Sequence, residues 1–318
     1  MKIITKIILI ILLIILSLLI ILKIRKKEKK LNIGIIQIAE HESLDKARNG
    51  FIDEMKNLGY DADFDIQIAG GDISNLNSIA QKFANDINKD LIFAISTPAT
   101  QSIANETEDV PILGTTVTDF EQSGLVKSSK HPGKNVSGTS DLVPVEKQID
   151  LLKTLVPNCK KVGILYSSGE ANSKLQADMA SNELEKLGIS VKHITVSNSN
   201  EVQSVVECNR DVDTLFIPTD NLIASCMPTV SQVASKNKIP IICSFADAVN
   251  KGGLACYAVD YYELGKLTAK QADKILKKEA KIESMPIEYL EDVKLVINYK
   301  KADELGIKIS EKLKGELQ

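Results

Sequence analysis

The pattern of hydrophobic and polar positions occurs twice along the chain. An apolar run around Gly34 is followed by a helical pattern that ends at Leu58-Gly59, and the same layout returns from Gly163 to Leu187-Gly188. The glycines recur at a constant offset, and about 25 residues align without a gap, which is the signature of an internal structural repeat. We therefore expect two lobes of similar fold with a cleft between them.

Within each copy, short apolar runs alternate with segments of helical periodicity. The expected strands cover 32–38, 63–68, 91–95 and 111–115 in the first copy, and 161–166, 190–196, 214–217 and 240–243 in the second. In the first copy we expect one helix that ends at Gly59, one over 72–88 and one that begins near Pro98. In the second copy we expect helices over 171–187, 200–209 and 222–236. This alternation is typical of parallel sheets covered by helices on both faces. The predicted fold class is α/β, with two Rossmann-like lobes.

The division between the lobes is less simple than the repeat. Residues 121–137 are rich in Ser, Gly and Lys and lack periodicity, which indicates a crossing segment or a hinge loop. A helical pattern near Glu263 has its counterpart near Val145, so we expect the chain to cross more than once. We assign 31–120 and about 262–285 to the first lobe, and about 121–261 and about 286–318 to the second.

Residues 1–30 form a separate segment. Residues 7–22 are an unbroken Ile/Leu run in which only Ser17 is polar. Sixteen helical residues span roughly 24 Å, and flanking lysines extend that length toward the bilayer core. No small-residue cleavage site follows, so we predict a transmembrane helix, either an anchor or an uncleaved signal sequence. Six basic residues follow the run and two precede it, which by the positive-inside tendency places the lobes in the cytoplasm.

Charge and cysteine usage exclude several functions. Residues 31–318 carry 31 basic and 41 acidic residues, and such an acidic surface argues against nucleic acid as a partner. The five cysteines are scattered without a Cys-x-x-Cys pair, and His41 has no His or Cys neighbours, so we expect no metal site. The phosphate-binding glycine motifs, the serine-hydrolase elbow and the zinc-protease motif are all missing. These observations favour a cleft that binds without catalysis and without a cofactor.

Two equivalent helix starts differ in chemistry. Ser96, Thr97, Thr100 and Gln101 follow a buried strand in the first copy, and a helix N-terminus without acids can hold a carboxylate. Asp220 and Asn221 take the equivalent place in the second copy. If the first start holds an anion and the second a cation, the pair suits a zwitterion such as an amino acid. Ordinary helix capping explains both starts equally well.

Other polar loops follow the remaining strands. Carboxylates can accept hydrogen bonds from an ammonium group, and amides and hydroxyls can donate to a carboxylate. The candidates in these loops are Glu40, His41, Asp119, Phe120 and Asp141 in the first copy, and Glu170, Asn172, Ser173, Phe245, Asp247 and Asp260 in the second. Asp141 and Asp260 are equivalent in the repeat, and each can be a helix cap instead.

Several of these blocks together resemble a known family. Ser96-Thr97-Pro98-Ala99, Val136 to Asp141, Pro218 to Asn221 and Val259 to Gly265 are similar to the substrate-binding proteins of ABC importers of the tryptophan/tyrosine type, over about residues 32–308. The resemblance implies a periplasmic-binding-protein fold of type I that closes on its ligand by a hinge motion. It also implies an aromatic amino acid as ligand, ABC permease subunits as partners, and an extracytoplasmic location at the cell membrane.

Three points stay open on the sequence. The chain has no Trp, so an aromatic ligand would stack on residues such as Phe120, Phe245, Tyr166 or Tyr257, each of which can equally be core. The basic residues after the apolar run conflict with export, and the first thirty residues contain no cysteine to receive a lipid. Two other functions compete: a ligand-sensing module without transport, and an enzyme that uses Asp220 with Glu40 or Glu170 as acid and base.

Overall fold

The computed structural model describes residues 30–315. The predicted membrane helix at residues 7–22 therefore lies outside the described residues. Within 30–315, no helix is long and apolar enough to cross a membrane. Residues 32–318 form a unit of their own, and the architecture below is that of this unit.

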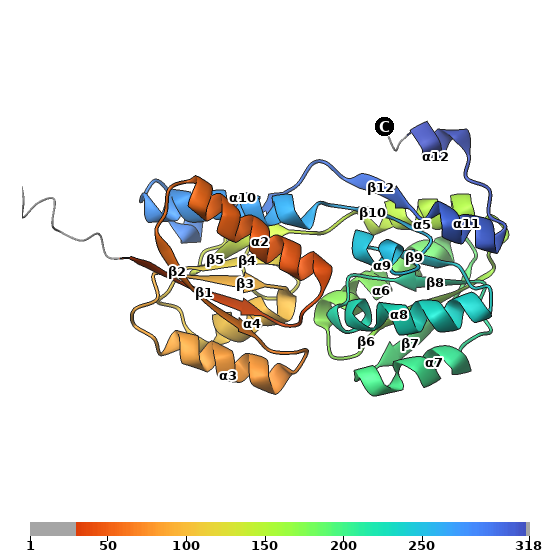
Figure 1. The fold of residues 1–318 in the computed structure, drawn as a ribbon, viewed down its shortest axis with the longest axis horizontal. Coiled ribbons are helices and arrows are strands. Elements are labelled where there is room, and N and C mark those ends of the chain that lie inside the picture. Colours follow the sequence, from red (N-terminus) through yellow and green to blue (C-terminus); the bar gives the residue numbers. More distant parts are fainter. Residues whose placement is uncertain (1–29, 316–318) are drawn as a thin grey trace, which may run out of the picture. The chain divides into compact units, whose positions relative to one another are not determined.

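The first sheet has six strands in the order β11-β5-β4-β3-β1-β2. The neighbouring pairs β1–β3, β3–β4, β4–β5 and β5–β11 are parallel. Its strands are β1 (Leu31–Gln37), β2 (Ala62–Ile68), β3 (Leu91–Ile95), β4 (Ile112–Val117), β5 (Val136–Ser140) and β11 (Glu288–Tyr289). Its helices are α2 (Glu42–Asn57), α3 (Ile73–Ala84), α4 (Thr97–Glu106) and α10 (Tyr261–Leu276). Figure 1 shows α2 and α10 on one face of this sheet and α3 and α4 on the other.

The second sheet repeats this plan in the order β12-β10-β9-β8-β6-β7. Its strands are β6 (Lys161–Ser167), β7 (Ser190–Val196), β8 (Thr214–Ile217), β9 (Ile241–Cys243), β10 (Ala255–Ala258) and β12 (Lys294–Ile297). Its helices are α5 (Val145–Leu155), α6 (Ala171–Lys186), α7 (Val202–Cys208), α8 (Asn221–Lys236), α9 (Ala246–Asn250), α11 (Tyr299–Leu305) and α12 (Glu311–Gly315), with a 3₁₀ turn at Ser199–Glu201. A second 3₁₀ turn, at Ile282–Ser284, lies beside β5 of the first sheet. Only β12 departs from the repeat, because it pairs antiparallel with β10.

The eight predicted strands are confirmed, with ends shifted by at most two residues. Among the predicted helices, the one over 72–88 is too long: α3 ends at Ala84. Asp86 then accepts a hydrogen bond from the backbone N–H of Asn88, and its own carbonyl accepts from Lys89. These turn contacts compete with continued helix, which apolar periodicity does not register.

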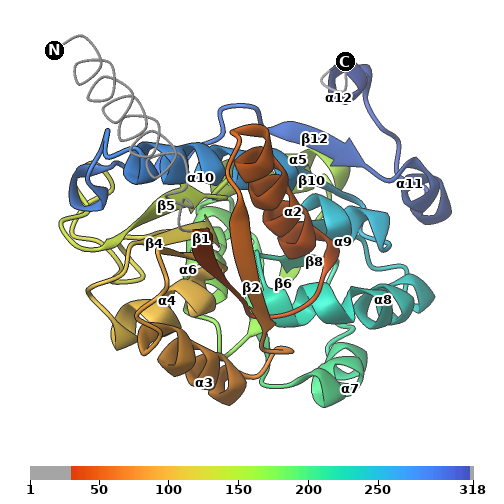
Figure 2. The ribbon, with the colours of Figure 1, turned by 60° about the vertical axis from the view of Figure 1, so that its left-hand side comes forward.

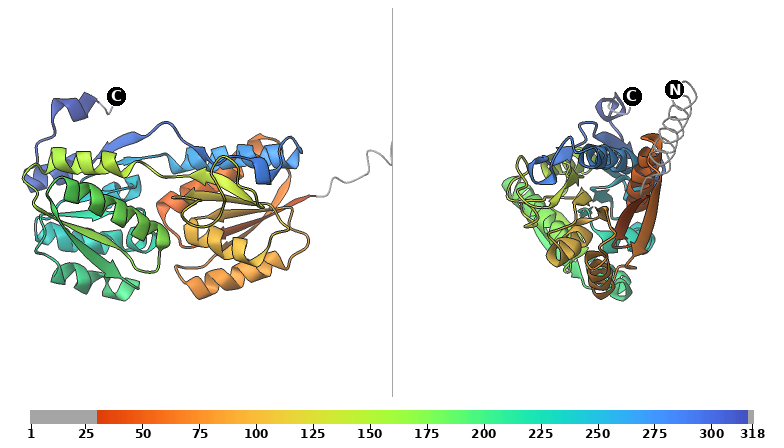
Figure 3. Two further views of the ribbon diagram at one scale, coloured as in Figure 1. Left: turned by 180° about the vertical axis from the view of Figure 1, so that it is seen from behind. Right: turned by 90° about the vertical axis from the view of Figure 1, so that its left-hand side faces the viewer.

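The predicted lobe boundaries are wrong at two places. Residues 121–140 do not cross between the lobes, because they return to the first sheet and supply its strand β5. Residues 288–289 also pair with the first sheet, at Thr139 and Ser140. The chain crosses instead at residues 141–144, 259–260 and 290–293, so α5 and α10 exchange lobes. Figures 1, 2 and 3 show these connections along one side of the molecule.

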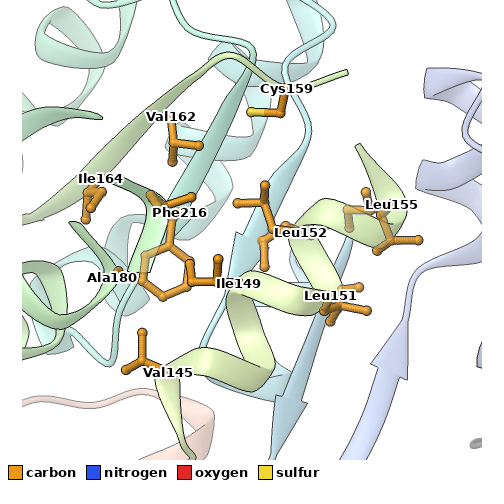
Figure 4. Close-up of a cluster of buried hydrophobic side chains, with 14 of the residues drawn as sticks. Val145, Ile149, Leu151, Leu152, Leu155, Cys159, Val162, Ile164, Ala180 and Phe216 are labelled. Carbon is orange, nitrogen blue, oxygen red and sulfur yellow. The ribbon is translucent and has the colours of Figure 1, made fainter. Parts of the chain in front are cut away.

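The second lobe is built on a continuous apolar core. Val145, Ile149 and Leu152 of α5 pack with Phe216 of β8 and with Val162 of β6, all at most 1% exposed (Figure 4). Their spacing is that of one helical face turned toward a sheet. Burial of each such side chain stabilises the fold by about 1.5–3 kcal/mol, so α5 is fixed to this lobe although the strand before it belongs to the other.

The first lobe contains an unusually close helix contact. A Cβ built on Gly50 of α2 would lie 2.0 Å from the carbonyl oxygen of Tyr262, and one built on Gly265 of α10 would lie 1.9 Å from that of Ala47. Glycine at both positions lets the two helix backbones touch directly (Figure 2). This contact fixes α10 on the first lobe immediately after the chain has crossed.

Candidate ligand-binding site between the lobes

The loops at the carboxyl ends of the strands face each other across the two lobes. They enclose a cavity of about 20 Å³, which is close to the room that a single small polar group requires. The described residues that line it are His41, Ser43, Leu44, Thr116, Thr118, Asp141, Asn172, Thr219, Asp220, Asn221, Ala224, Phe245 and Tyr261. Both lobes and the first crossing segment, through Asp141, therefore contribute to one site.

A wider groove adjoins this cavity. It has a volume of about 860 Å³ and is lined by the loops after β1, β2, β6 and β7 and by the starts of α3, α4 and α8. Asn221 lines both spaces, and the groove residues Glu40 and Glu170 lie close in the chain to the cavity residues His41 and Asn172. The cavity and the groove thus form an inner and an outer part of the same cleft.

Side chains of the two lobes bond directly across the cleft. His41 Nε2 lies 3.3 Å from Asn221 Oδ1, and the hydroxyls of Thr118 and Thr219 are 3.1 Å apart. Gln176 of α6 donates from Nε2 to both threonine hydroxyls. The lobes are therefore in direct polar contact around the cavity.

Four cavity side chains each carry a buried polar atom that has no partner among the described residues: His41 Nδ1, Thr116 Oγ1, Asp141 Oδ1 and Asn172 Oδ1. All four side chains are at least nine-tenths buried. A buried polar atom without a partner costs about 1–3 kcal/mol, and such atoms are uncommon in folded proteins. Their gathering at one cavity makes it the candidate site for a bound polar group.

The surrounding hydrogen bonds determine the role of the His41 atom. Asn221 donates from Nδ2 to Glu170 Oε2 at 2.5 Å, so its Oδ1 is the atom that faces His41. An amide oxygen only accepts, and Nε2 of the neutral ring must therefore carry the proton. Nδ1 is then a bare acceptor. Burial lowers the pKa of His41 to about 4, which keeps this ring neutral at neutral pH.

Asn172 and Asp141 add two more acceptors. Asn172 donates from Nδ2 to the carbonyl of Thr219, which fixes its Oδ1 as the free atom. Asp141 accepts from the hydroxyl of Tyr261 with one oxygen and keeps the other, Oδ1, unpartnered. Burial raises the pKa of Asp141 to about 6, so it is ionised at neutral pH. Three acceptors, one of them charged, match the three N–H donors of a primary ammonium group.

The N-terminus of α8 is occupied by carboxylates of the protein itself. Asp220 accepts from the backbone N–H of Ile223 at 2.8 Å and from that of Ser167 at 2.6 Å. Glu170 accepts from the N–H groups of Asn221 and Leu222, both at 3.0 Å. Burial, together with the charge of Asp220, raises the pKa of Glu170, and burial raises that of Asp220. Asp220 thus caps α8 and also lines the cavity, while its binding of a ligand stays a prediction.

We expect Asp220→Ala to lower the free energy of unfolding by about 2 kcal/mol, because the variant loses a helix cap and leaves the buried Ser167 N–H unpaired. Relief of the repulsion with Glu170 offsets part of this loss. Asp220→Asn keeps one acceptor and should lose about half as much. Urea unfolding at pH 7 measures all three proteins, and wild-type stability in Asp220→Ala would contradict the capping role.

The N-terminus of α4 is also largely satisfied internally. Ser96 accepts from the N–H of Ala99 through its hydroxyl and from that of Thr100 through its carbonyl, and Pro98 has no N–H. Ser96 has φ 106° and Thr116 has φ 54°, a region that costs non-glycine residues of order 1–3 kcal/mol. Backbone strain of this kind concentrates at functional sites, and Thr116 lines the cavity.

The predicted site residues divide into three groups. The cavity is lined by His41, Asp141, Asn172, Asp220, Asn221 and Phe245, and the groove by Glu40 and Glu170 in addition to Asn221. Outside both linings lie Ser96, Thr97, Thr100, Gln101, Asp119, Phe120, Ser173, Asp247 and Asp260.

The residues outside the linings have contacts of their own. Three of them stabilise starts or turns: Ser96 caps α4, Asp260 caps α10, and Asp119 accepts from the N–H groups of Glu121 and Gln122. In the first lobe, the hydroxyl of Thr97 accepts from the N–H of Thr118, the hydroxyl of Thr100 donates to the carbonyl of Ser96, and Gln101 donates to the carbonyl of Ser123. In the second lobe, the hydroxyl of Ser173 donates to the carbonyl of Thr219, and Asp247 forms an ion pair with Lys251. Phe120 is core at 1% exposed.

Sequence reasoning did not select seven of the lining residues: Ser43, Leu44, Thr116, Thr118, Thr219, Ala224 and Tyr261. Each lies within about one helical turn of a selected position in the chain. Tyr261 directly follows Asp260, the residue that the repeat makes equivalent to Asp141. Among the aromatic candidates, Phe245 lines the cavity, whereas Tyr166 and Tyr257 pack on the core of the second lobe.

Two like sheets, three chain crossings and a polar cavity between the lobes define a binding protein of the periplasmic-binding-protein type. The family model described as ABC transporter substrate binding protein matches residues 32–316. This chain belongs to that family of binding proteins, which are not enzymes.

Known relatives are similar over most of the chain. A "Tyrosine-binding protein" of Clostridioides difficile (strain R20291) is 45% identical over 276 residues, which is 85% of this chain and 79% of the relative. A crystal structure from Streptococcus pneumonia in complex with L-Trp is 38% identical, covers 91% of this chain and 98% of its own, and superposes with a TM-score of 0.86.

A ligand-free, open structure of a substrate-binding protein with adhesive properties from Clostridium difficile gives a different result. It is 42% identical and covers 88% of this chain and 96% of its own, but its TM-score is 0.67. The more identical chain is therefore the less similar structure. By this measure the structure as a whole is more similar to the L-Trp complex than to the open relative.

Proposed function

We propose that this protein captures a free aromatic amino acid, tyrosine or tryptophan, between its lobes and presents it to the permease of an ABC importer. The observation that carries the proposal is the set of three buried acceptors, His41 Nδ1, Asp141 Oδ1 and Asn172 Oδ1, which suits an α-ammonium group. The named ligands of two relatives, tyrosine and L-Trp, support the aromatic class. Phe245 and Tyr261 in the same lining offer the ligand apolar and aromatic surface.

Binding would act by population shift between open and closed lobes. A ligand that contacts both lobes favours the closed arrangement in proportion to its differential affinity. His41 belongs to the first lobe, Asn172 to the second, and Asp141 to the first crossing segment. A single ammonium group held by all three would therefore join the lobes at the hinge.

The first thirty residues contain the predicted membrane helix. We propose that they anchor the lobes to the outer side of the cell membrane, next to the permease, as the type I binding-protein role requires. The basic residues after the apolar run oppose this orientation. Protease added to intact cells should degrade the lobes if the proposal holds, whereas protection until the cells are lysed would place the lobes in the cytoplasm.

The ligand is identified by thermal unfolding of the full-length protein, purified in detergent, against each of the twenty amino acids. A ligand at a hundredfold excess over its Kd stabilises the folded state by about 2.7 kcal/mol. We expect tyrosine or tryptophan to raise the Tm most. If no amino acid raises the Tm, the amino-acid proposal fails.

Binding should depend on pH through Asp141. The pKa of this carboxyl is raised to about 6 by burial, so it is ionised above pH 6 and can pair with an ammonium group. Below pH 6 the ligand must displace a proton, and affinity should fall by up to about tenfold per pH unit. His41, with its pKa lowered to about 4, stays neutral over this range. Calorimetry between pH 5 and 6, well below the pKa of about 8 to which burial raises Glu170, measures the slope, which should vanish in Asp141→Asn.

A further inference from the structure

Gln176 of α6 joins the two lobes through its amide group. The side chain is 2% exposed, and it is not among the residues that line the cavity. Its Oε1 accepts from the backbone N–H of Thr219 at 3.2 Å, so its Nε2 is the atom that faces the hydroxyls of Thr118 and Thr219. An amide nitrogen carries two hydrogens. Each threonine hydroxyl therefore receives one of them.

On the second lobe, Gln176 determines the position of Thr219. The carbonyl of Thr219 accepts from Asn172 Nδ2 at 3.0 Å and from the hydroxyl of Ser173 at 2.9 Å, while its N–H donates to Gln176. The bond from Asn172 to this carbonyl is the one that leaves Asn172 Oδ1 as the unpartnered atom at the cavity. The orientation of this acceptor therefore depends on where Gln176 holds Thr219.

On the first lobe, the same amide reaches the segment that carries Asp141. Gln176 Nε2 donates to the Thr118 hydroxyl at 3.2 Å. The carbonyl of Thr118 accepts from the Ser140 hydroxyl at 2.8 Å, and that hydroxyl accepts from the N–H of Leu142 at 3.1 Å. Asp141 lies between Ser140 and Leu142, so the turn that holds its carboxyl at the cavity is connected to Thr118.

Thr118 belongs to the first lobe, whereas Gln176 and Thr219 belong to the second. Separation of the lobes would break the bond between Gln176 and Thr118 and keep the bonds between Gln176 and Thr219. We infer that Gln176 is a positioning residue for ligand binding, which fixes the spacing of the acceptors Asn172 and Asp141 when the lobes are closed. It acts through the two threonines. This inference rests on the proposed function, because it assumes that these acceptors hold the ligand.

Calorimetry with L-tyrosine on the full-length protein in detergent tests the inference with a matched pair of variants. Gln148 of α5 is also a buried glutamine of the second lobe, at 1% exposed, but its amide bonds to the backbone of Tyr257 in the same lobe. Methionine is of similar length and makes none of these bonds. We expect Gln176→Met to weaken tyrosine binding at least about twentyfold and Gln148→Met to leave it within about threefold, although both should lower the Tm.

A double-mutant cycle separates positioning from a general loss of structure. Thr118→Val removes the first-lobe end of the connection and keeps the bonds between Gln176 and Thr219, so it carries the test if Gln176→Met does not fold. We expect Thr118→Val to weaken tyrosine binding at least about tenfold. The double variant should bind no more than about threefold more weakly than Gln176→Met, because both changes remove the same connection.

The outcomes distinguish this inference from the proposed function. If tyrosine binds the wild type and Gln176→Met within about threefold of each other, the inference is overturned and the proposed function stands. Equal losses in Gln176→Met and Gln148→Met, or losses that multiply in the double variant, also overturn the inference alone. If neither tyrosine nor tryptophan binds the wild type, the proposed function fails and the inference fails with it.

Discussion

Replacing Asp141 with Asn should weaken the binding of tyrosine or tryptophan by at least about a hundredfold, which corresponds to about 2.7 kcal/mol. The side chain is 4% exposed, and its Oδ1 has no partner among the described residues. The variant would keep the bond from Tyr261 but lose the negative charge. Truncating one side of a buried charge pair costs about 2–5 kcal/mol, because the partner remains buried and unpaired.

The same substitution should not weaken the fold. Burial raises the pKa of Asp141 to about 6, so above that pH the ionised carboxyl destabilises the free protein. We expect the Tm of free Asp141→Asn at pH 8 to equal or exceed that of the wild type. Calorimetry with tyrosine and thermal unfolding without ligand separate the two effects. An affinity within threefold of the wild type would remove Asp141 from the site.

Replacing Gly265 with Ala should lower the free energy of unfolding by about 3 kcal/mol, at the upper end of the usual cost of overpacking. The new Cβ would lie 1.9 Å from the carbonyl oxygen of Ala47 and 2.9 Å from the backbone nitrogen of Phe51. Both are backbone atoms of α2, so no side chain can turn away to make room. The helices α2 and α10 would have to separate.

Gly315→Ala is the matched control, because a Cβ there meets nothing within 4 Å and Gly315 is not among the glycines with positive φ. It should change stability by less than about 0.5 kcal/mol. Urea unfolding measures both variants. Since α10 begins at Tyr261, which lines the cavity, Gly265→Ala should also weaken tyrosine binding. A stable Gly265→Ala protein would mean that the α2–α10 contact is looser than described.

Much of the fold follows from local pattern. The eight strands recognised in the chain are those of the two sheets, since a buried parallel strand must be a short apolar run wherever it lies. The division into lobes could not be obtained in this way. Residues 121–137 lack periodicity, and nothing local indicates that they return to the first sheet before the chain crosses at 141–144.

The sequence by itself determined the repeated α/β plan, the family and the loops that hold the polar candidates, because these depend on periodicity and on short blocks of residues. The tertiary structure decided which candidates meet. Ser96 and Asp260 are caps, whereas Asp141, the repeat partner of Asp260, faces the cavity with one oxygen unpartnered. Capping and ligand binding use the same side chains at the same helix starts, so only the position of the opposite lobe distinguishes them.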